Sequence, residues 1–192
     1  MVNEIICIGD SITGWNNLSR NPYDWPVPTY PRYLDELVKN AKKTREVINA
    51  GFNGARSNEL PRIFSEYELS YPQSEYIIMQ FGTNDFHAEG FRPQISNRIC
   101  SYLSSGIKIS KHLNKIPIII NQHRISSEAS SIARIEKHNA HLAAECRRWK
   151  IPCVDIYSRI RDHNLRDNFH PNGGGARLIA EEVYRVLMQT AG

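Results

Sequence analysis

Ser11 stands in the segment "GDSITG", directly after an apolar run that is typical of a buried strand. A serine hydroxyl attacks efficiently only when a neighbouring base removes its proton, and a carboxylate commonly orients that base. Near the end of the chain, Asp167 precedes His170 by three residues, so one tight turn can bring the carboxylate to the imidazole. The three side chains together could form the nucleophile, base and orienting acid of a serine hydrolase.

Each of these residues also has an ordinary structural interpretation. A serine after a strand often caps a helix or shapes a turn, and Asp167 with His170 could simply cap the last helix. Asp162 and His163 are a competing acid–base pair. Adjacent side chains on a turn diverge, however, so His170 is the better candidate for the base.

Acyl transfer also requires N–H donors that stabilise the negatively charged oxygen of the tetrahedral intermediate. Gly54 in "NAGFNGA" and Asn84 in "GTND" are suitable donors, and the backbone amide of Ser11 is a third. Singly, Gly54 and Asn84 are ordinary turn residues. Their occurrence after successive predicted strands, together with Asp167 and His170, favours an oxyanion hole.

The glycines of the first loop could instead hold a phosphate. Gly9 and Gly14 have the separation found in G-x-x-x-x-G-K-[ST], but Trp15 and Asn16 occupy the positions of the lysine and the hydroxyl residue. Asp10 would add a negative charge, and no G-x-G-x-x-G pattern occurs. We therefore expect neither a phosphate loop nor a nucleotide cofactor.

Length and composition predict one globular domain that spans residues 1–192, with 41% hydrophobic and 23% charged residues. The net charge of +4 is spread along the chain, which does not favour nucleic-acid binding. The longest aliphatic run, Ile116–Ile120, is too short to cross a membrane, so no stable membrane insertion is expected. The sequence leaves the oligomeric state open.

The amino-terminal segment has no basic and long apolar stretch of the kind found in secretion signals. The four cysteines are widely separated and form no C-x-x-C pair. These features predict a reduced, cytoplasmic setting. His138, His141 and Cys146 share a helical segment, but they lack the spacing of known zinc motifs, so no metal is expected.

Apolar runs alternate with segments of helical periodicity along the chain, which predicts a parallel sheet with helices on both faces. Strands are expected at Glu4–Ile8, Arg45–Ala50, Glu75–Phe81, Ile116–Asn121 and Ile151–Ile156. Helices are expected at Thr29–Lys42, Ser57–Tyr67, Pro93–Leu113, Glu128–Lys150 and Gly174–Met188. We predict an α/β flavodoxin-like fold of three layers with strand order 2-1-3-4-5, whose site lies at the carboxyl ends of the strands.

Four blocks of the chain occur in the order found in the SGNH (GDSL) hydrolases, which the sequence resembles. The blocks are "GDSIT", "INAGFNGA", "GTND" and "DNFHPN", and they extend from residue 9 to residue 172. The resemblance implies a three-layer hydrolase that forms an acyl-serine intermediate. It assigns Ser11 as nucleophile, His170 as base and Asp167 as its orienting acid, with the Ser11 amide, Gly54 and Asn84 as oxyanion donors.

The same resemblance separates the chain from the α/β-hydrolases, which place their serine in G-x-S-x-G after several strands. Here Thr13 stands where the second glycine would be. Substrates of the SGNH family include lipids, thioesters, aryl esters and acetylated sugars, so the resemblance does not specify one.

Aromatic and polar residues on the rim loops suggest a polar substrate. The candidate substrate-binding residues are Trp15, Trp25, His87, Arg92, His123 and Arg124. They indicate a small-molecule ester with a short acyl chain, such as an acetylated carbohydrate, although Trp15 and Trp25 could simply pack their loop. The alternatives are a lysophospholipase or thioesterase of the same family, and a non-catalytic flavodoxin-like ligand-binding module.

Overall fold

The computed structural model describes residues 3–14, 28–41, 45–90, 92–125 and 129–190. Within these residues a parallel sheet has the order β2-β1-β3-β4-β5, so the predicted flavodoxin-like order is confirmed. The strands are β1 (Asn3–Gly9), β2 (Arg45–Gly51), β3 (Ser74–Gln80), β4 (Ile116–Ile120) and β5 (Cys153–Val154).

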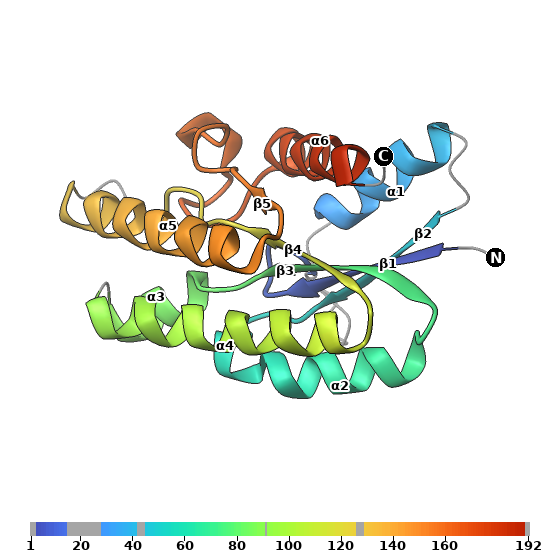
Figure 1. The fold of residues 1–192 in the computed structure, drawn as a ribbon. Helices are drawn as coiled ribbons and strands as arrows, with labels where there is room; N and C mark the ends of the chain where they lie inside the picture. Colours follow the sequence, from blue (N-terminus) through green and yellow to red (C-terminus); the bar gives the residue numbers. More distant parts are fainter. Residues whose placement is uncertain (1–2, 15–27, 42–44, 91, 126–128, 191–192) are drawn as a thin grey trace.

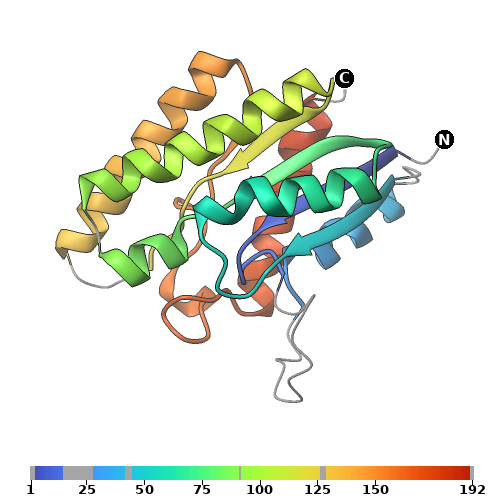
Figure 2. The ribbon, with the colours of Figure 1, turned by 90° about the horizontal axis from the view of Figure 1, so that it is seen from below.

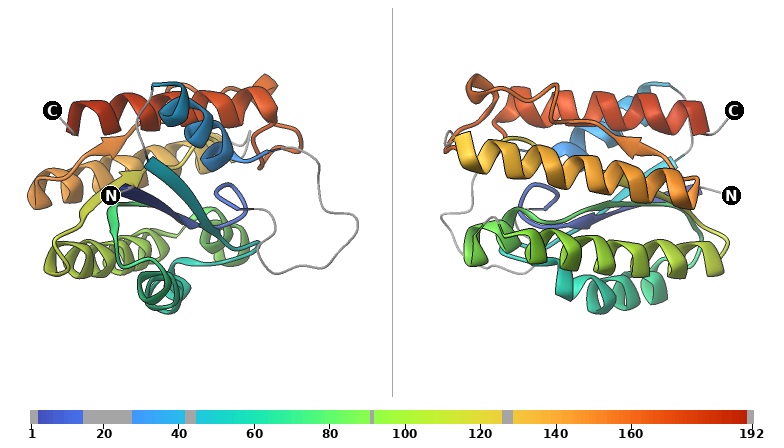
Figure 3. Two further views of the ribbon diagram at one scale, coloured as in Figure 1. Left: turned by 90° about the vertical axis from the view of Figure 1, so that its right-hand side faces the viewer. Right: turned by 60° about the vertical axis from the view of Figure 1, so that its left-hand side comes forward.

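Helices cover both faces of this sheet, as Figures 1 and 3 show. They are α1 (Tyr30–Asn40), α2 (Leu60–Ser70), α3 (Thr83–Glu89), α4 (Pro93–His112), α5 (Ala129–Trp149) and α6 (Gly173–Thr190). Two short 3₁₀ helices, η1 (Ser57–Glu59) and η2 (Asp162–Asn164), lie in the connections. Helices α1 and α6 pack on one face, and α2, α4 and α5 pack on the other (Figure 2).

The near-continuous apolar runs of the central strands result from this three-layer arrangement. In β1, Ile6 and Ile8 join the core beneath α2, α4 and α5, whereas Ile5 and Cys7 join the core beneath α1 and α6. Successive side chains of a strand point to opposite faces, so a strand covered on both sides must be apolar at every position. In the described part of the chain, none of the helices combines the length and apolar character needed to cross a membrane.

The last strand is shorter than its sequence predicts. The run Ile151–Ile156 was expected to be a strand, but only Cys153 and Val154 pair with β4. The backbone N–H of Ile156 donates to Oδ1 of Asn121 at 2.8 Å. This side-chain contact takes the place of a ladder hydrogen bond and ends the strand.

The segment after β3 also differs from its prediction. Residues 86–93 were expected to form a rim loop, but Thr83–Glu89 form the helix α3. The side chain of Phe86 is buried in the core, and this contact anchors one side of the helix. A helix of two turns is too short to show a clear periodicity in the sequence, so only the tertiary contact reveals it.

Candidate active site

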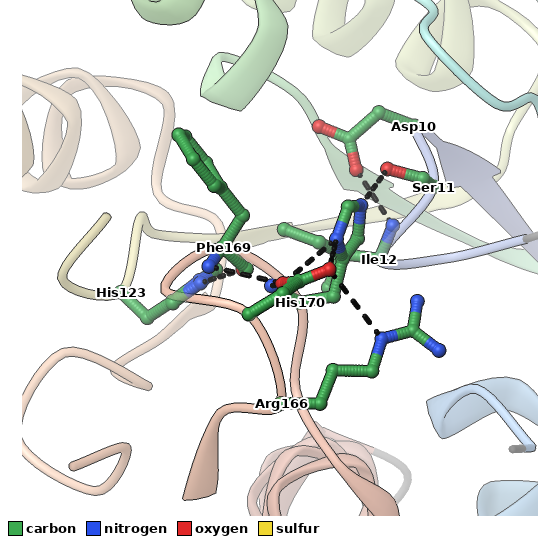
Figure 4. Close-up of polar contacts among 8 residues, drawn as sticks. Asp10, Ser11, Ile12, His123, Arg166, Phe169 and His170 are labelled. Atoms are coloured by element: carbon green, nitrogen blue, oxygen red, sulfur yellow. Dashed lines mark hydrogen bonds and ion pairs between the residues drawn. The ribbon is translucent and has the colours of Figure 1, made fainter. Parts of the chain in front are cut away.

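Ser11, His170 and Asp167 form a continuous hydrogen-bonded chain at the carboxyl end of the sheet (Figure 4). Oγ of Ser11 lies 3.0 Å from Nε2 of His170. The opposite ring nitrogen, Nδ1 of His170, lies 2.8 Å from Oδ2 of Asp167. When the proton of His170 is on Nδ1 and is donated in a hydrogen bond to the carboxylate, Nε2 is left free to accept the proton of the serine hydroxyl.

A tight turn after β1 presents Ser11 to the histidine. The backbone N–H groups of Thr13 and Gly14 donate to the carbonyl oxygen of Asp10 at 3.1 and 2.9 Å. A Cβ atom on Gly14 would lie 2.6 Å from the carbonyl oxygen of Gly51 in β2, too close for any other residue. The two glycines therefore allow the turn to pack directly against the neighbouring strand.

The loop ahead of α6 brings Asp167 and His170 together through backbone geometry. Oδ1 of Asp167 accepts the backbone N–H groups of His170 at 2.7 Å and of Phe169 at 3.2 Å. Asn168 lies between them in the left-handed region with φ 60°, which asparagine tolerates better than most residues. The N–H of Arg166 donates to the carbonyl oxygen of His170 at 3.0 Å and closes the turn.

The surroundings of His170 favour its neutral form. Burial lowers the pKa of His170 below its ordinary value of 6.5, and the nearby Arg166 lowers it further, while Asp167 opposes both. Burial raises the pKa of Asp167, but hydrogen bonds from the backbone and ring of His170 outweigh it, so the net pKa is lowered. At neutral pH an ionised carboxylate thus faces a neutral imidazole, as a general base requires.

Asp10 lies directly before the serine and is fully buried. Its Oδ1 accepts the backbone N–H of Ile12 at 2.9 Å (Figure 4), whereas Oδ2 has no hydrogen-bond partner. Burial raises the pKa of Asp10 to about 7, and the charge of Asp85 adds to this effect. The side chain therefore holds the turn that carries Ser11 and has little stabilisation for its own charge.

Gly54 and Asn84 lie in neighbouring segments that are joined by a hydrogen bond. Nδ2 of Asn84 donates to the carbonyl oxygen of Ala55 at 2.9 Å, which leaves a second N–H on the same nitrogen. Gly54 has φ +76°, and a Cβ there would contact nothing within 4 Å, so backbone conformation alone calls for glycine. Asp85 accepts the N–H and hydroxyl of Ser57 at 2.9 and 2.7 Å and anchors α3 to this turn.

An open pocket of about 180 Å³ lies above Ser11. Its lining residues are Ser11, Asn53, Thr83, Asn84, His87, Phe169 and His170. A narrower crevice on the other side of Ser11 contacts Thr29 and Arg166. The pocket therefore collects residues that follow β1, β2 and β3 and the loop ahead of α6.

The residues predicted to bind substrate have different locations. His87 is exposed, lines the pocket of Ser11 and packs its ring edge-on against Phe169 at 5.0 Å between ring centroids. His123 is fully buried, and its Nε2 lies 2.7 Å from the carbonyl oxygen of Phe169. Arg92 lines a separate pocket, and Arg124 is half-buried near Tyr157, whose pKa is raised by burial and lowered in part by the charge of Arg124. Trp15 and Trp25 lie outside the described residues.

Sequence reasoning did not single out several residues that the structure brings to Ser11. Asn53 and Thr83 line its pocket. Nε of Arg166 lies 3.8 Å from Oδ2 of Asp167. Each is adjacent in sequence to a residue of a predicted motif, and this proximity is the signal that could have identified them. The competing base His163 is exposed and lines neither space beside Ser11 in the described residues.

Comparisons with known proteins are consistent with this geometry. The model of the GDSL-like Lipase/Acylhydrolase family matches residues 7–178. No significant match was found among curated proteins. An acetylxylan esterase from Geobacillus stearothermophilus has a TM-score of 0.78 at 17% identity, with 96% of this chain and 94% of that chain covered. A member of the lipolytic protein G-D-S-L family from Veillonella parvula has a TM-score of 0.75 at 23% identity, with 98% and 100% covered.

At these identities the two solved structures establish a shared fold. The family match carries more information, because it spans residues 7–178 and so extends over nearly the whole chain. The chain therefore belongs to the GDSL-like lipase/acylhydrolase family and is a hydrolase that acts on ester bonds.

Proposed function

We propose that the protein is a serine esterase that forms an acyl-serine intermediate at Ser11. The observation that carries this proposal is the chain of hydrogen bonds from Ser11 through His170 to Asp167. Nε2 of His170 takes the hydroxyl proton while Oγ attacks the ester carbonyl carbon, and it then returns the proton to the leaving alcohol. Water then gives a proton to the same nitrogen and attacks the acyl carbon, and the bond to Oγ of Ser11 breaks as Nε2 passes that proton to Oγ and the acid is released.

The oxyanion hole of this reaction would consist of the backbone amides of Ser11 and Gly54 and the side-chain amide of Asn84. Two facts support this assignment. The bond from Asn84 to Ala55 holds its amide in place and leaves one N–H available, and both Ser11 and Asn84 line the same pocket. Such pre-oriented donors stabilise the charge that develops on the carbonyl oxygen in the transition state.

We further propose that the acyl chain is short, an acetyl group on a carbohydrate, and that residues 1–192 form a single domain. Among the described residues, no aliphatic side chain lines the pocket of Ser11. Asn53, Thr83 and His87 instead supply amide, hydroxyl and imidazole groups suited to sugar hydroxyls. The structural likeness to an acetylxylan esterase supports the same substrate class.

A fluorophosphonate probe tests the reaction type, because it labels only an activated serine. Labelling should be complete in the wild-type protein and absent in Ser11→Ala, with Ser101→Ala, at an exposed position of α4, as a control that keeps the nucleophile. Absence of labelling in the folded wild type would favour a non-catalytic ligand-binding module.

A series of p-nitrophenyl esters tests the acyl length. Each methylene that finds a pocket adds up to about 0.8 kcal/mol of binding, so kcat/KM against chain length reports pocket depth. We expect a maximum at acetate or butyrate and a decline by octanoate. Activity that rises through decanoate would contradict the short-chain proposal and favour a lysophospholipase or thioesterase. Release of acetate from acetylated xylooligosaccharides would then test the carbohydrate.

A further inference from the structure

A second pocket, of about 150 Å³, lies outside the site of Ser11. Its walls come from α3, from the start of α4 and from the middle of α5, three helices that neighbour one another in Figure 2. In the described part of the chain, no residue lines both this pocket and the pocket above Ser11. Helix α3 separates them, with Asn84 and His87 in one and Phe86 in the other. We call this second space the α4–α5 pocket.

His138 gives the α4–α5 pocket a buried polar wall. The residue is fully buried, and its Nδ1 lies 2.8 Å from Oγ of Ser96, which also lines the pocket. Its Nε2 has no hydrogen-bond partner. Phe86 packs edge-on against the ring, with centroids 5.1 Å apart. A buried polar atom without a partner is unfavourable unless a ligand or water satisfies it.

The state of the His138 ring indicates what such a ligand must offer. Burial lowers the pKa of His138 to about 4, and the neighbouring His141 contributes to this shift, so the ring is neutral at pH 7. A neutral imidazole carries one proton. When the hydroxyl of Ser96 donates to Nδ1, that proton lies on Nε2. The unpartnered atom is then a donor, which requires an acceptor.

The charges around the α4–α5 pocket also favour an acceptor that is negatively charged. Arg92, Arg134 and Lys137 line the pocket, and among the described residues no carboxylate does so. Phe86 and Pro93 supply an apolar part of the wall. The volume is close to the ~150 Å³ of a cavity that holds a benzene-sized molecule. A ligand that fits these features has one anionic group and a small apolar body.

We propose that the α4–α5 pocket binds a small oxyanion, a phosphate or carboxylate group carried on a short apolar body. Nε2–H of His138 donates to the oxyanion, and Arg92 and Lys137 balance its charge. The apolar body contacts Phe86 and Pro93. This site is distinct from the pocket above Ser11, because the two share no described lining residue.

Isothermal titration of the Ser11→Ala protein with phenyl phosphate tests the proposal without any turnover. We expect phenyl phosphate to bind at one site per chain, with an affinity that decreases as salt is added. Benzoate in place of phenyl phosphate distinguishes a carboxylate site from a phosphate site, and neutral phenol should not bind measurably. Absence of binding by both anions would overturn the proposal.

Variants locate the bound probe. Lys137→Gln and His138→Phe should each weaken binding by about tenfold, the usual loss for one charge-assisted or buried hydrogen bond. Arg147→Gln removes an exposed cation of the same helix outside the pocket and should leave affinity unchanged. Lys137 is exposed, so its variant tests the site even if His138→Phe unfolds the protein. Equal affinity in Lys137→Gln and the parent protein, or an equal loss in Arg147→Gln, would place the probe elsewhere and refute the proposal.

Discussion

Nε2 of His123 lies 2.7 Å from the backbone carbonyl oxygen of Phe169, the residue directly before His170 (Figure 4). His123 is fully buried, and burial lowers its pKa to about 4, so the ring is neutral at pH 7 and donates this hydrogen bond from Nε2. The bond ties the segment after β4 to the loop that carries Asp167 and His170. It gives His123 a positioning role for the base.

Replacing His123 with phenylalanine should therefore lower kcat by about 10–100-fold with little change in KM, since a displaced base misaligns the reacting atoms. His123→Gln keeps an N–H donor and should restore part of the rate. Steady-state kinetics on p-nitrophenyl acetate measures both parameters. An increase in KM alone would instead place the ring in contact with the substrate, as the sequence suggested.

Ser11→Ala and His170→Ala should each abolish turnover while the protein remains folded. Both side chains act in one proton-transfer unit, so the double variant should be little slower than either single variant. Single-turnover rates, with circular dichroism as the folding control, provide the comparison. If His163→Ala lost activity while His170→Ala kept it, the base would be misassigned.

Asn84→Ala should reduce kcat by about 10²–10³-fold and leave KM nearly unchanged, because an oxyanion donor acts mainly in the transition state. Asn53→Ala is the matched control, since Asn53 lines the same pocket and has no assigned role at the carbonyl oxygen. We expect it to alter KM more than kcat. A pure KM effect in Asn84→Ala would make Asn84 a substrate-binding residue.

The pH dependence of kcat/KM should show an acid limb below pH 6.5. His170 must be neutral to act as base, and burial lowers its pKa from 6.5, so activity is lost as pH falls through this lower value. Arg166 also lowers the pKa of His170, and Arg166→Gln should therefore move the limb to higher pH. Arg161→Gln, at an exposed position, is the control. A limb that does not move in Arg166→Gln would show that another group controls it.

Asp10→Asn should change the pH dependence of stability. The pKa of Asp10 is raised from 3.8 to about 7, so the folded state binds more protons than the unfolded state between these values. The contribution of protonated Asp10 to the free energy of unfolding is therefore complete below about pH 3.8. This contribution is lost as the pH rises through about 7. Between pH 5 and pH 8 the loss is on the order of 2 kcal/mol.

Urea unfolding at these two pH values measures the effect. The wild type should lose more stability between pH 5 and pH 8 than Asp10→Asn does, because asparagine has no charge to desolvate. Asp35→Asn, at a half-buried position on α1, serves as the carboxylate control. Equal pH dependence in wild type and Asp10→Asn would contradict a raised pKa at Asp10.

The order of the sheet and the meeting of Ser11 with His170 were accessible from the sequence. Apolar runs of strand length alternate with helical periodicity, and parallel strands place all their carboxyl ends at one edge. Residues that directly follow strands must then lie near one another, however distant they are in the chain. The contact between Asp167 and His170 can be predicted without knowledge of the sheet. The two residues are three positions apart on a tight turn, which brings their side chains into contact.

Only the tertiary structure decided the direction of the other rim side chains. His123 was expected to touch substrate, but contacts with a loop 46 residues away bury its ring beneath Phe169. Arg92 was expected beside Ser11, but the short helix α3 intervenes and directs it to the α4–α5 pocket. Sequence periodicity is set by each segment's own burial pattern and so reveals strands and helices. The orientation of a loop side chain depends on packing between distant segments, which no local pattern records.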